Sequence, residues 1–570
     1  MHVVTTRRHY KDKVYETTLL RRSYREAGKV KNETLANLSH LPAETIGLIR
    51  RSLAGEAHVA AGEAFEIERS LPHGHVAALG AMAHSLGLAK VLGPACGERD
   101  LALALVLGRA ARPASKLATT RWWTDTTLAA DLGVAGASTD DVYAAMDWLM
   151  GRQVSIEASL ARRHLDEGAM VLYDLSSSWM EGRSCPLAAR GYSRDPKSGK
   201  TQIEYGLMCD VEGRPISVEV FTGNTADPTA FVSATSIVRE RFGLTSVVMV
   251  GDRGMITSAR IEALRALGGM DWITSLRAPA VRALAADGVL QLSLFDEANL
   301  AEITHPDFPG ERLVACRNPA LAAERGRKRE ELLAATESLL RPIVAAVDAG
   351  RLRGADTIGL RVGRALNRYK MAKHFELDIG EDSFAFARKA DQIAAEAALD
   401  GIYVVRTSVG PERLDAGGVV ESYKGLSVVE ADFRSLKTID LDLRPVHHHL
   451  EQRVRAHVFI CMLAAYVLWH LRRAWAPLCF TDEEPPVRDD PVAPARPSPQ
   501  ARTKASRQRS TDDHPVHSLA TLLEHLATLT RNTVVFAGGV RIDKLSVPTE
   551  LQRRAFELIS EPIPLKVPAA

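Results

Sequence analysis

Apolar runs of strand length alternate with a helical pattern through the middle of the chain. From Gly168 onward the sequence predicts three strands, a helix and a fourth strand, in the order Met170–Tyr173, Thr201–Cys209, Pro215–Phe221, Ala226–Phe242 and Thr245–Val250. A further strand is predicted over Asp400–Thr407, after a long intervening segment. This order predicts an α/β domain built on a mixed sheet.

Residues 1–165 have a different pattern, which is mainly helical after a short extended start. Apolar residues recur at helical spacing over His75–Leu92 and Asp100–Ala111, and Thr139-Asp-Asp supplies a capping signal before Val142–His164. Basic side chains are dense near the start, at Arg7, Arg8, Lys11, Lys13, Arg21, Arg22, Arg25, Lys29 and Lys31. A charge run of this kind either solvates a surface or contacts DNA phosphates.

Two aspartates stand directly after predicted strands. Asp174 follows the apolar run that begins at Val171, and Asp252 follows the run that begins at Val247. A carboxylate just past a buried strand lies at the carboxyl edge of the sheet. An aspartate at such a position is more often a turn or helix cap, so each one alone is a weak signal of catalysis.

A third carboxylate lies on a predicted helix that runs from Tyr423 to Lys437. Tyr423, Glu430 and Lys437 are seven residues apart, and a helix drifts by only about 20° per heptad, so the three side chains point from one face. Three carboxylates would repel one another in a cluster, so they indicate a site completed by divalent metal. Asp432 and Glu421 are the alternatives for the third ligand, and a solvated helix face is the alternative for Glu430 and Lys437.

The sequence resembles the DDE transposases of bacterial insertion sequences whose last acid lies in a Tyr-x2-Arg-x3-Glu-x6-Lys motif. Here the motif has the form Tyr423-x2-Leu426-x3-Glu430-x6-Lys437, with leucine in place of arginine. Other segments similar to that group are Gly191–Asp195, Gln202–Gly206, Gly213–Ile216, Gly223–Asp227, Asp400–Tyr403 and Arg455–His457. The resemblance covers most of residues 1–475, and the ordered set of motifs carries it.

The resemblance implies a ribonuclease-H-like mixed-sheet catalytic core interrupted by an inserted domain, with a mainly helical N-terminal DNA-binding region. In that fold the first and fourth strands are neighbours, so Asp174 and Asp252 are expected to lie together. By the same resemblance Asp174, Asp252 and Glu430 are the catalytic residues and hold Mg²⁺ or Mn²⁺, as a pair of ions. The residues implied to contact DNA are Tyr423, Lys437, Arg434 and Arg253.

The implied activity is that of a transposase that binds terminal inverted repeats, cleaves DNA strands in a metal-dependent reaction and transfers them to a target. The implied partners are the double-stranded DNA of the element's ends and of the target, and a second copy of the chain in a homodimer that pairs two ends. The implied location is the bacterial cytoplasm, at the nucleoid when the protein is bound to DNA.

The predicted domains follow from these elements. They are a DNA-end-binding region (1–165), two parts of the catalytic core (166–277 and 399–478), an inserted domain (278–398), a flexible linker (479–514) and a small C-terminal segment (515–570). The inserted domain is predicted to contain strands near 288–294 and 384–388 and helices over 320–349. Its basic residues are compatible with holding a transposon end; they are Arg325, Arg327, Lys328, Arg329, Arg364, Arg368, Lys370 and Lys373.

Composition narrows the class of protein. A chain of 570 residues with 46% hydrophobic and 25% charged residues is typical of a globular protein of several domains. The net charge is only +2, so a nucleic-acid surface must be sought in local clusters. The six cysteines form no CxxC pair, which argues against a zinc ribbon and a disulfide framework. The apolar run Ala456–Leu471 is shorter than the roughly 18 residues of a spanning helix, so we expect a buried helix and no membrane contact.

Two other functions compete with active transposition. A catalytically silent, domesticated descendant would bind DNA without cutting it, although it would not need all three acids. A glycoside hydrolase would use two of the carboxylates without metal and would present an aromatic platform for sugars, but aromatic residues make up only 6% of the chain.

Overall fold

The computed structural model describes residues 1–11, 13–56, 64–181, 184–195, 197, 199–291, 293, 295–483, 497–536 and 538–568. It divides into two units, one formed by Met1–Ser70 with Arg531–Ser546 and the other by Leu71–Thr530 with Val547–Ala570. All three predicted catalytic acids belong to the larger unit, which is described first.

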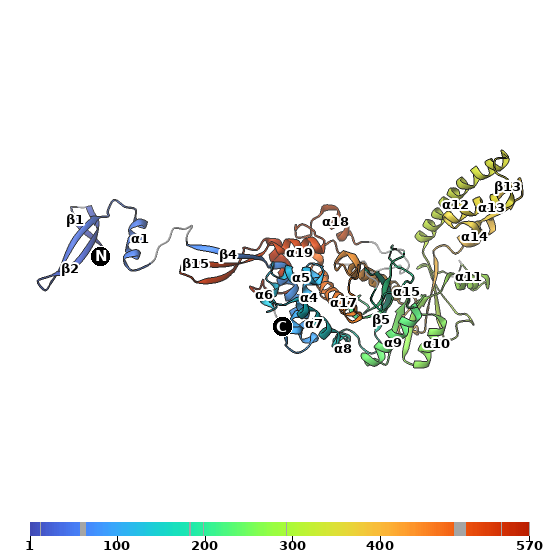
Figure 1. Cartoon of the computed structure of the whole chain (residues 1–570), viewed down its shortest axis with the longest axis horizontal. Helices are drawn as coiled ribbons and strands as arrows, with labels where there is room; N and C mark the ends of the chain where they lie inside the picture. Colours follow the sequence, from blue (N-terminus) through green and yellow to red (C-terminus); the bar gives the residue numbers. More distant parts are fainter. Residues whose placement is uncertain are drawn as a thin grey trace. The chain divides into compact units, whose positions relative to one another are not determined.

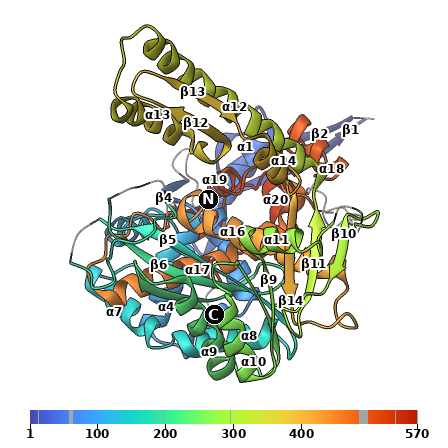
Figure 2. The ribbon, with the colours of Figure 1, turned by 90° about the vertical axis from the view of Figure 1, so that its right-hand side faces the viewer.

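An eight-stranded mixed sheet is the main sheet of the larger unit (Figures 1 and 2). Its strands, in order across the sheet, are β10 (Leu300–Ile303), β11 (Arg312–Arg317), β14 (Ile402–Thr407), β9 (Met270–Ser275), β8 (Val247–Gly251), β5 (Met170–Trp179), β6 (Gln202–Cys209) and β7 (Pro215–Thr222). Strands β5, β8 and β9 run parallel, and the other neighbours pair antiparallel. Most residues of β5, β6 and β8 are buried, which explains their continuous apolar runs. The predicted mixed α/β fold is confirmed.

Strands β5 and β8 are neighbours, as the sequence predicted. They pair in parallel with Tyr173 opposite Gly251, so Asp174 and Asp252 each follow at the same level. Helix α9 (Asp227–Ser236) and a π-helical turn (Ile237–Arg241) connect β7 to β8, within the range predicted to be helical. Helices α10 (Ser258–Leu267) and α11 (Ala278–Ala286) flank β9 in sequence.

The predicted helix around Glu430 is present, but it is not a uniform α-helix. It consists of α15 (Ala416–Lys424), α16 (Leu426–Arg434) and a π-helical turn (Ser435–Ile439). Asp415 caps α15 by accepting a 2.7 Å hydrogen bond from the backbone N–H of Gly418. A Cβ on Gly425 would lie 3.7 Å from Leu172, so the junction of the two helices packs closely on β5.

The long apolar helix is α17 (Glu451–Ala474), and it is buried as predicted. The helix has 24 residues and is therefore longer than the predicted apolar run. One 18-residue window within it has a mean hydropathy of 1.6, which by length and composition alone would be enough to cross a membrane. However, 83% of that window is buried inside the protein, as in the core helix of a globular fold. Burial therefore accounts for the hydropathy of α17.

Among the described residues of the larger unit, seven helices precede the main sheet in sequence. They are α2 (Gly74–Ser85), α3 (Leu88–Leu92), α4 (Gly97–Ala111), α5 (Lys116–Trp123), α6 (Leu128–Asp131), α7 (Thr139–Met150) and α8 (Gln153–His164). Three of them, α2, α4 and α7, pack against α17. Helix α7 begins with a capping box between Ser138 and Asp141. The helical pattern predicted for this part of the chain is confirmed.

The C-terminal segment joins this helical region instead of standing apart. Helices α19 (Leu519–Ala527) and α20 (Glu550–Leu558) belong to the larger unit. Trp475 Nε1 donates to the carbonyl of Ala555 over 2.9 Å, and the Val567 N–H donates to Asp131 Oδ2 over 2.8 Å. The end of the chain thus closes the helical core that begins at residue 71.

The smaller unit begins with a three-stranded antiparallel sheet formed by β1 (His2–Tyr10), β2 (Lys13–Glu26) and β3 (Lys29–Asn37), followed by α1 (Ala43–Leu53). A second sheet, of order β16-β15-β4, combines β4 (Phe65–Pro72), β15 (Thr530–Phe536) and β16 (Arg541–Leu545). The predicted short extended start is therefore wrong in extent. Among the described residues of β1 to β3 only Thr18 is buried, so the strands lack the apolar alternation that would have revealed them.

Residues 318–401 form an arm that leaves the main sheet after β11 and returns at β14. The arm contains α12 (Pro319–Asp348), α13 (Ala355–Tyr369), β12 (Phe375–Ile379), β13 (Phe384–Arg388) and α14 (Ala390–Ala397), with α12 and α13 side by side (Figure 2). It has its own apolar core, which includes Leu340, Ile358 and Phe384. Arg317 pairs with Ile402, so the two ends of the arm lie on paired residues.

The arm is smaller than the predicted inserted segment, 278–398. Strands β10 and β11 fall within that segment but belong to the main sheet. The predicted helices over 320–349 and strand near 384–388 are present, whereas the described residues of 288–294 form no strand, and 292 and 294 lie outside the described residues.

The predicted linker 479–514 is described only in part. Residues 484–496 lie outside the described residues, and the described remainder contains helix α18 (Pro499–Arg507). Ser498 caps this helix, and the buried Lys504 Nζ donates to the carbonyl of Ala476 over 3.0 Å. The helix is anchored by polar contacts, which is why the segment shows no apolar period.

Candidate active site

Asp174 and Asp252 lie at one edge of the main sheet. Because the parallel pairing sets Tyr173 opposite Gly251, the next residues, Asp174 and Asp252, lie at the same level along the two strands. Asp174 is half-buried and Asp252 is exposed. Asp252 Oδ1 also accepts a 2.6 Å hydrogen bond from the Arg253 N–H, so this aspartate orders its own turn as well as facing the site.

Glu430 reaches the same place from α16, which packs against β5. Its nearness is visible in the electrostatics of Asp174. Burial raises the pKa of Asp174 to about 7, a backbone hydrogen bond at Leu175 opposes that shift, and the charges of Asp252 and then Glu430 raise the pKa further. Asp252 and Glu430 therefore both lie close enough to Asp174 for their charges to act on it.

These residues fit divalent metal in chemistry and in charge. Carboxylates are the ligands that hard cations prefer, and a buried carboxyl that faces two others ionises more readily beside a cation. In the described part of the chain no three His, Cys, Asp or Glu side chains converge closely enough to form a ready-made metal cage. The charges of Asp252 and Glu430 reach Asp174, but the three carboxylates do not converge on one metal position in the described structure.

The competing carboxylates are placed elsewhere. Asp432 on α16 lies beside Cys209, whose thiol donates to Asp432 Oδ2 over 3.7 Å. Burial raises the pKa of Asp432 to about 7, while the Cys209 hydrogen bond and the charge of Arg472 lower it. Glu421 is exposed on α15. Of the three carboxylates Glu421, Glu430 and Asp432, Glu430 is the one whose charge raises the pKa of Asp174.

Sequence reasoning missed three further charged residues at this edge. Arg194 Nη2 donates to Asp227 Oδ1 over 2.6 Å, and Arg194 Nη1 lies 3.8 Å from Glu204 Oε2. A Cβ on Gly254 would lie 3.2 Å from Asp227 Oδ2 and 3.5 Å from Asp252 Oδ2, so the two carboxylates flank the same backbone.

Arg194 opposes the charge of the acids around it. Its charge lowers the pKa of Asp174. Burial raises the pKa of Glu204 to about 7, Arg194 lowers it, and Asp227 raises it. Arg194, Glu204 and Asp227 all occur within the segments that carry the family resemblance, and that was the available signal.

Lys437 is placed differently from the prediction. Its side chain is buried, and Nζ donates to Asp195 Oδ1 over 3.0 Å. Arg444 also donates to Asp195 Oδ1 and stacks over Trp179, 4.9 Å from the ring centroid. Burial lowers the pKa of Lys437, and the charge of Asp195 opposes that shift. We call Asp195, Lys437 and Arg444 the Asp195 network.

The single face predicted for Tyr423, Glu430 and Lys437 does not extend to Lys437. Tyr423 is half-buried, with Oη 2.7 Å from Ser275 Oγ, and Glu430 is exposed. Lys437 lies in the π-helical turn, where the hydrogen bonds span five residues and the heptad register no longer holds. Arg434, the last residue of α16, is exposed.

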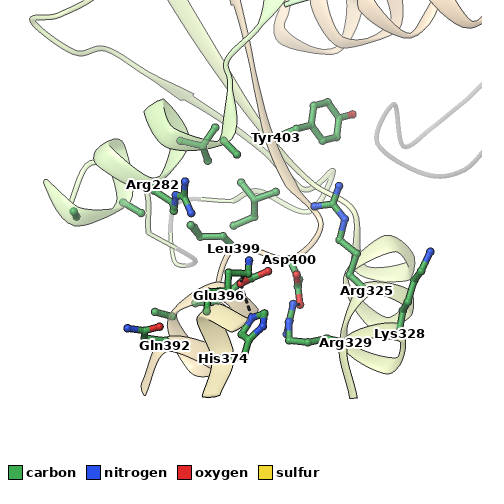
Figure 3. Close-up of a pocket in the computed structure, with 18 of the residues that line it drawn as sticks. Arg282, Arg325, Lys328, Arg329, His374, Gln392, Glu396, Leu399, Asp400 and Tyr403 are labelled. Atoms are coloured by element: carbon green, nitrogen blue, oxygen red, sulfur yellow. Dashed lines mark hydrogen bonds and ion pairs between the residues drawn. The ribbon is translucent and has the colours of Figure 1, made fainter. Parts of the chain in front are cut away.

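A basic cavity of about 990 Å³ lies between α11, the start of α12 and α14 (Figure 3). Its lining includes seven cationic side chains and only two carboxylates. Arg329 pairs with Asp400, and Lys373 with Glu396. The other cations of the lining are Arg253, Arg282, Arg325, Lys328 and Lys370, and Arg253 directly follows Asp252. The lining thus includes one residue that is adjacent in sequence to a predicted catalytic acid.

Two family models match the chain. The model of the N-terminal domain of IS1634 family transposases matches residues 3–66, and the model of the transposase DDE domain matches residues 186–468. The second match contains Asp252 and Glu430, while Asp174 precedes it. No curated protein matches the chain.

A solved structure also resembles the chain. It is the cryo-EM structure of the piggyBac transposase synaptic complex with hairpin DNA, which matches at 9% identity and a TM-score of 0.34 over 65% of this chain and 66% of that one. The chain thus spans slightly less than two thirds of that protein, and a likeness of this size carries no argument about the site.

Proposed function

The chain belongs to the DDE transposases of insertion sequences, and from this we propose that it binds the terminal inverted repeats of such an element, cleaves DNA at their ends and transfers the strands to a target. The observation that carries the proposal is the level placement of Asp174 and Asp252 on neighbouring parallel strands, with the helix of Glu430 packed on one of them. A catalytically silent descendant would have no need of this arrangement.

We further infer that the core is ribonuclease-H-like. The order β7-β6-β5-β8-β9, in which three antiparallel strands are followed by two parallel ones, supports this fold. The arm then takes the part of the inserted domain, and the helical region from α2 to α8 and the smaller unit contribute to DNA-end binding.

Asp174, Asp252 and Glu430 would hold Mg²⁺ or Mn²⁺, in our proposal as a pair of ions. Bound metal would supply activation of water and charge stabilisation of the leaving oxygen, which phosphodiester cleavage requires. The chain's own contribution is to keep three carboxylates close together in spite of their repulsion. Arg194 serves this purpose because its charge favours ionisation of Asp174.

The basic cavity supports a path for a DNA strand that begins at the acids. Arg253 would contact a phosphate at the cleavage site. Arg325, Lys328 and Lys370 of the arm, which form no ion pair with a described residue, would contact phosphates farther along. Arg434 is exposed on α16 and is available for a phosphate on the other side of Glu430. Tyr423 fixes α15 against β9 through Ser275.

Lys437 has a positioning role in this proposal. Its buried ion pair with Asp195 anchors the turn after Glu430, so it acts on the site without touching DNA. Two copies of the chain would pair the two ends of the element, and the reaction would take place on chromosomal DNA in the cytoplasm.

The test is Mg²⁺-dependent cleavage of a labelled duplex that carries the element's inverted repeat, with the Asp174→Asn variant. The matched control is Asp432→Asn, which changes a half-buried carboxyl of similar pKa that lies beside Cys209. We expect cuts at the repeat boundary with the wild type and the control but none with Asp174→Asn. Cleavage by Asp174→Asn at the wild-type rate would contradict the assignment, and binding without cleavage by the wild type would favour the silent descendant.

A further inference from the structure

The N-terminal sheet, β1 to β3, has two faces of different charge, which follows from its strand register. Residues directly opposite each other in an antiparallel pair point to the same face, and successive residues alternate. Arg7 pairs with Glu16 and Arg22 with Glu33, so the acids can be assigned to a face strand by strand.

All three described acids of the sheet lie on one face, which we call the paired face. There Arg7 contacts Glu16 at 2.5 Å and Arg22 contacts Glu33 at 2.7 Å, and Lys31 pairs with Glu26. Helix α1 also reaches this face, because Arg50 Nη2 donates to Thr5 Oγ1 over 2.7 Å. Thr5 Oγ1 lies 3.1 Å from Thr18 Oγ1, the buried residue of the sheet.

The opposite face, which we call the open face, has cations without acids. By the register it carries Arg8, Lys13, Arg21 and Arg25, and none of its described residues is acidic. Arg8, Lys13 and Arg25 are exposed. None of the four forms an ion pair with a described residue, whereas three cations of the paired face do.

The side chains between these cations are uncharged. Thr6 and Thr17 are opposite each other, and Ser23 Oγ donates to Asn32 Oδ1 over 2.7 Å. Arg8 lies opposite Tyr15, six residues from Arg21 along β2, which corresponds to about 20 Å of strand. A major groove is about 12 Å wide, so cations at this separation can reach the phosphates on both of its sides while threonine side chains face the base edges.

We propose that the open face binds double-stranded DNA by lying in the major groove, with Arg8, Lys13, Arg21 and Arg25 on phosphates. This rests on the proposed function, since the duplex is the element's inverted repeat. Charge complementarity selects the partner: an unpaired cationic face suits a polyanion, while a second copy of the chain would present the same positive charge. The paired face suits a polyanion less well, because three of its four described cations, Arg7, Arg22 and Lys31, already have carboxylates.

The experiment compares two double variants of the full-length chain that remove the same charge. Arg8→Gln/Arg21→Gln changes the open face, and Arg7→Gln/Arg22→Gln changes the adjacent positions on the paired face. Binding to a labelled inverted-repeat duplex is measured by fluorescence anisotropy at several salt concentrations, with chelator present to prevent cleavage. Thermal unfolding checks that each variant is folded.

We expect the open-face variant to reduce the slope of log K against log salt by about 1.8, the value for two lost phosphate contacts, and to weaken binding at least about tenfold at 0.1 M salt. The paired-face variant should change the slope by less than about 0.5. A second open-face pair, Lys13→Gln/Arg25→Gln, avoids the half-buried Arg21 and should behave like the first.

Three results would overturn the proposal. Equal slopes for the two faces would show that charge alone matters. An open-face variant that binds DNA normally but loses self-association in sedimentation would make a second copy the occupant. A wild-type protein that does not bind the repeat would reject the proposed function itself, which the first two outcomes leave intact.

Discussion

The acid edge, formed by Asp174, Asp252 and Glu430, and the Asp195 network treat charge in opposite ways. At the acid edge the charges of Asp252 and Glu430 add to burial, which raises the pKa of Asp174 to about 7. In the Asp195 network, Asp195 is buried and forms ion pairs with two cations, Lys437 and Arg444. Arg194 and Asp195 are adjacent, and each serves a different cluster.

The acid edge thus contains charges that are available to ligands, whereas the Asp195 network contains charges that stabilise the fold. A carboxylate without a protein partner lowers the stability of the isolated chain and can take a cation, whereas a paired carboxylate has no capacity left. The same distinction applies to cations, since Lys437 is paired inside the protein, whereas Lys328 forms no ion pair with a described residue. The residues most useful for function are those that the chain leaves unpaired.

The sharpest test of the comparison is Glu430→Gln. Cleavage should fall by roughly 10²- to 10⁴-fold, the size that corresponds to several kcal/mol of lost charge stabilisation, while DNA binding and thermal stability are retained. Cleavage assays and gel shifts on the inverted-repeat duplex measure the two effects. Glu421→Gln, at an exposed carboxylate on α15, is the control and should cut normally. A Glu430→Gln protein that unfolds more easily would place Glu430 among the structural charges.

Asp195→Asn should have the reverse effect. It leaves the buried Lys437 and the half-buried Arg444 without their counter-charge, so chemical denaturation should reveal a loss of roughly 3 kcal/mol or more in the free energy of unfolding. Asp252→Asn is the control and should not be less stable than the wild type, since Asp252 is exposed. If Asp195→Asn unfolded like the wild type but did not cut DNA, Asp195 would have a role in catalysis and not in stability.

Asp174→Asn should stabilise the metal-free protein at alkaline pH. The pKa of Asp174 is raised to about 7 in the folded chain from 3.8, so the wild type loses stability as pH rises from about 4 to about 7. The asparagine variant does not titrate there, and its advantage should grow over that interval to roughly 2–4 kcal/mol and then stay constant. Calorimetry in chelator at pH 4.5 and 8.5 measures it. Parallel pH profiles for the two proteins would contradict the raised pKa.

The smallest effect concerns the basic cavity. Lys328→Gln removes a lining cation that forms no ion pair with a described residue. It should reduce the salt slope of DNA binding by about 0.9, with a few-fold loss of affinity. The control is Arg327→Gln at the adjacent position, where the arginine is exposed and pairs with Glu331 at 2.8 Å. Equal effects of the two substitutions would remove the distinction between paired and unpaired cations in the arm.

The sequence was sufficient for five of the eight strands of the main sheet and for the neighbourhood of two acids, but it did not reveal β9, β10 and β11. The runs before Asp174 and Asp252 are apolar because β5 and β8 are buried, and burial is what apolar runs report. The helix of Glu430 was also predictable, because its apolar residues recur on the one face that contacts the core. Helix α17 was predictable because it is apolar on nearly all sides, as a fully surrounded helix is.

Three features were not predictable, each for a physical reason. The π-helical turn that removes Lys437 from the exposed face leaves no mark in residue spacing. The N-terminal sheet is stabilised by backbone pairing and surface ion pairs, so it has no apolar period. The contact of the chain's end with α6, through Val567 and Asp131, depends on tertiary packing across 436 residues.

Arg317 and Ile402, the paired residues at which the arm leaves and re-enters the main sheet, make the arm an excursion from what is otherwise a short hairpin. Evolution can lengthen, shorten or exchange such an excursion without altering the register of β11 and β14 or the level of the two aspartates. In the proposed function the hold of the arm on DNA phosphates and the cutting chemistry are thus separable traits, and the lineage of an element could change one by recombination at this junction while inheriting the other unaltered.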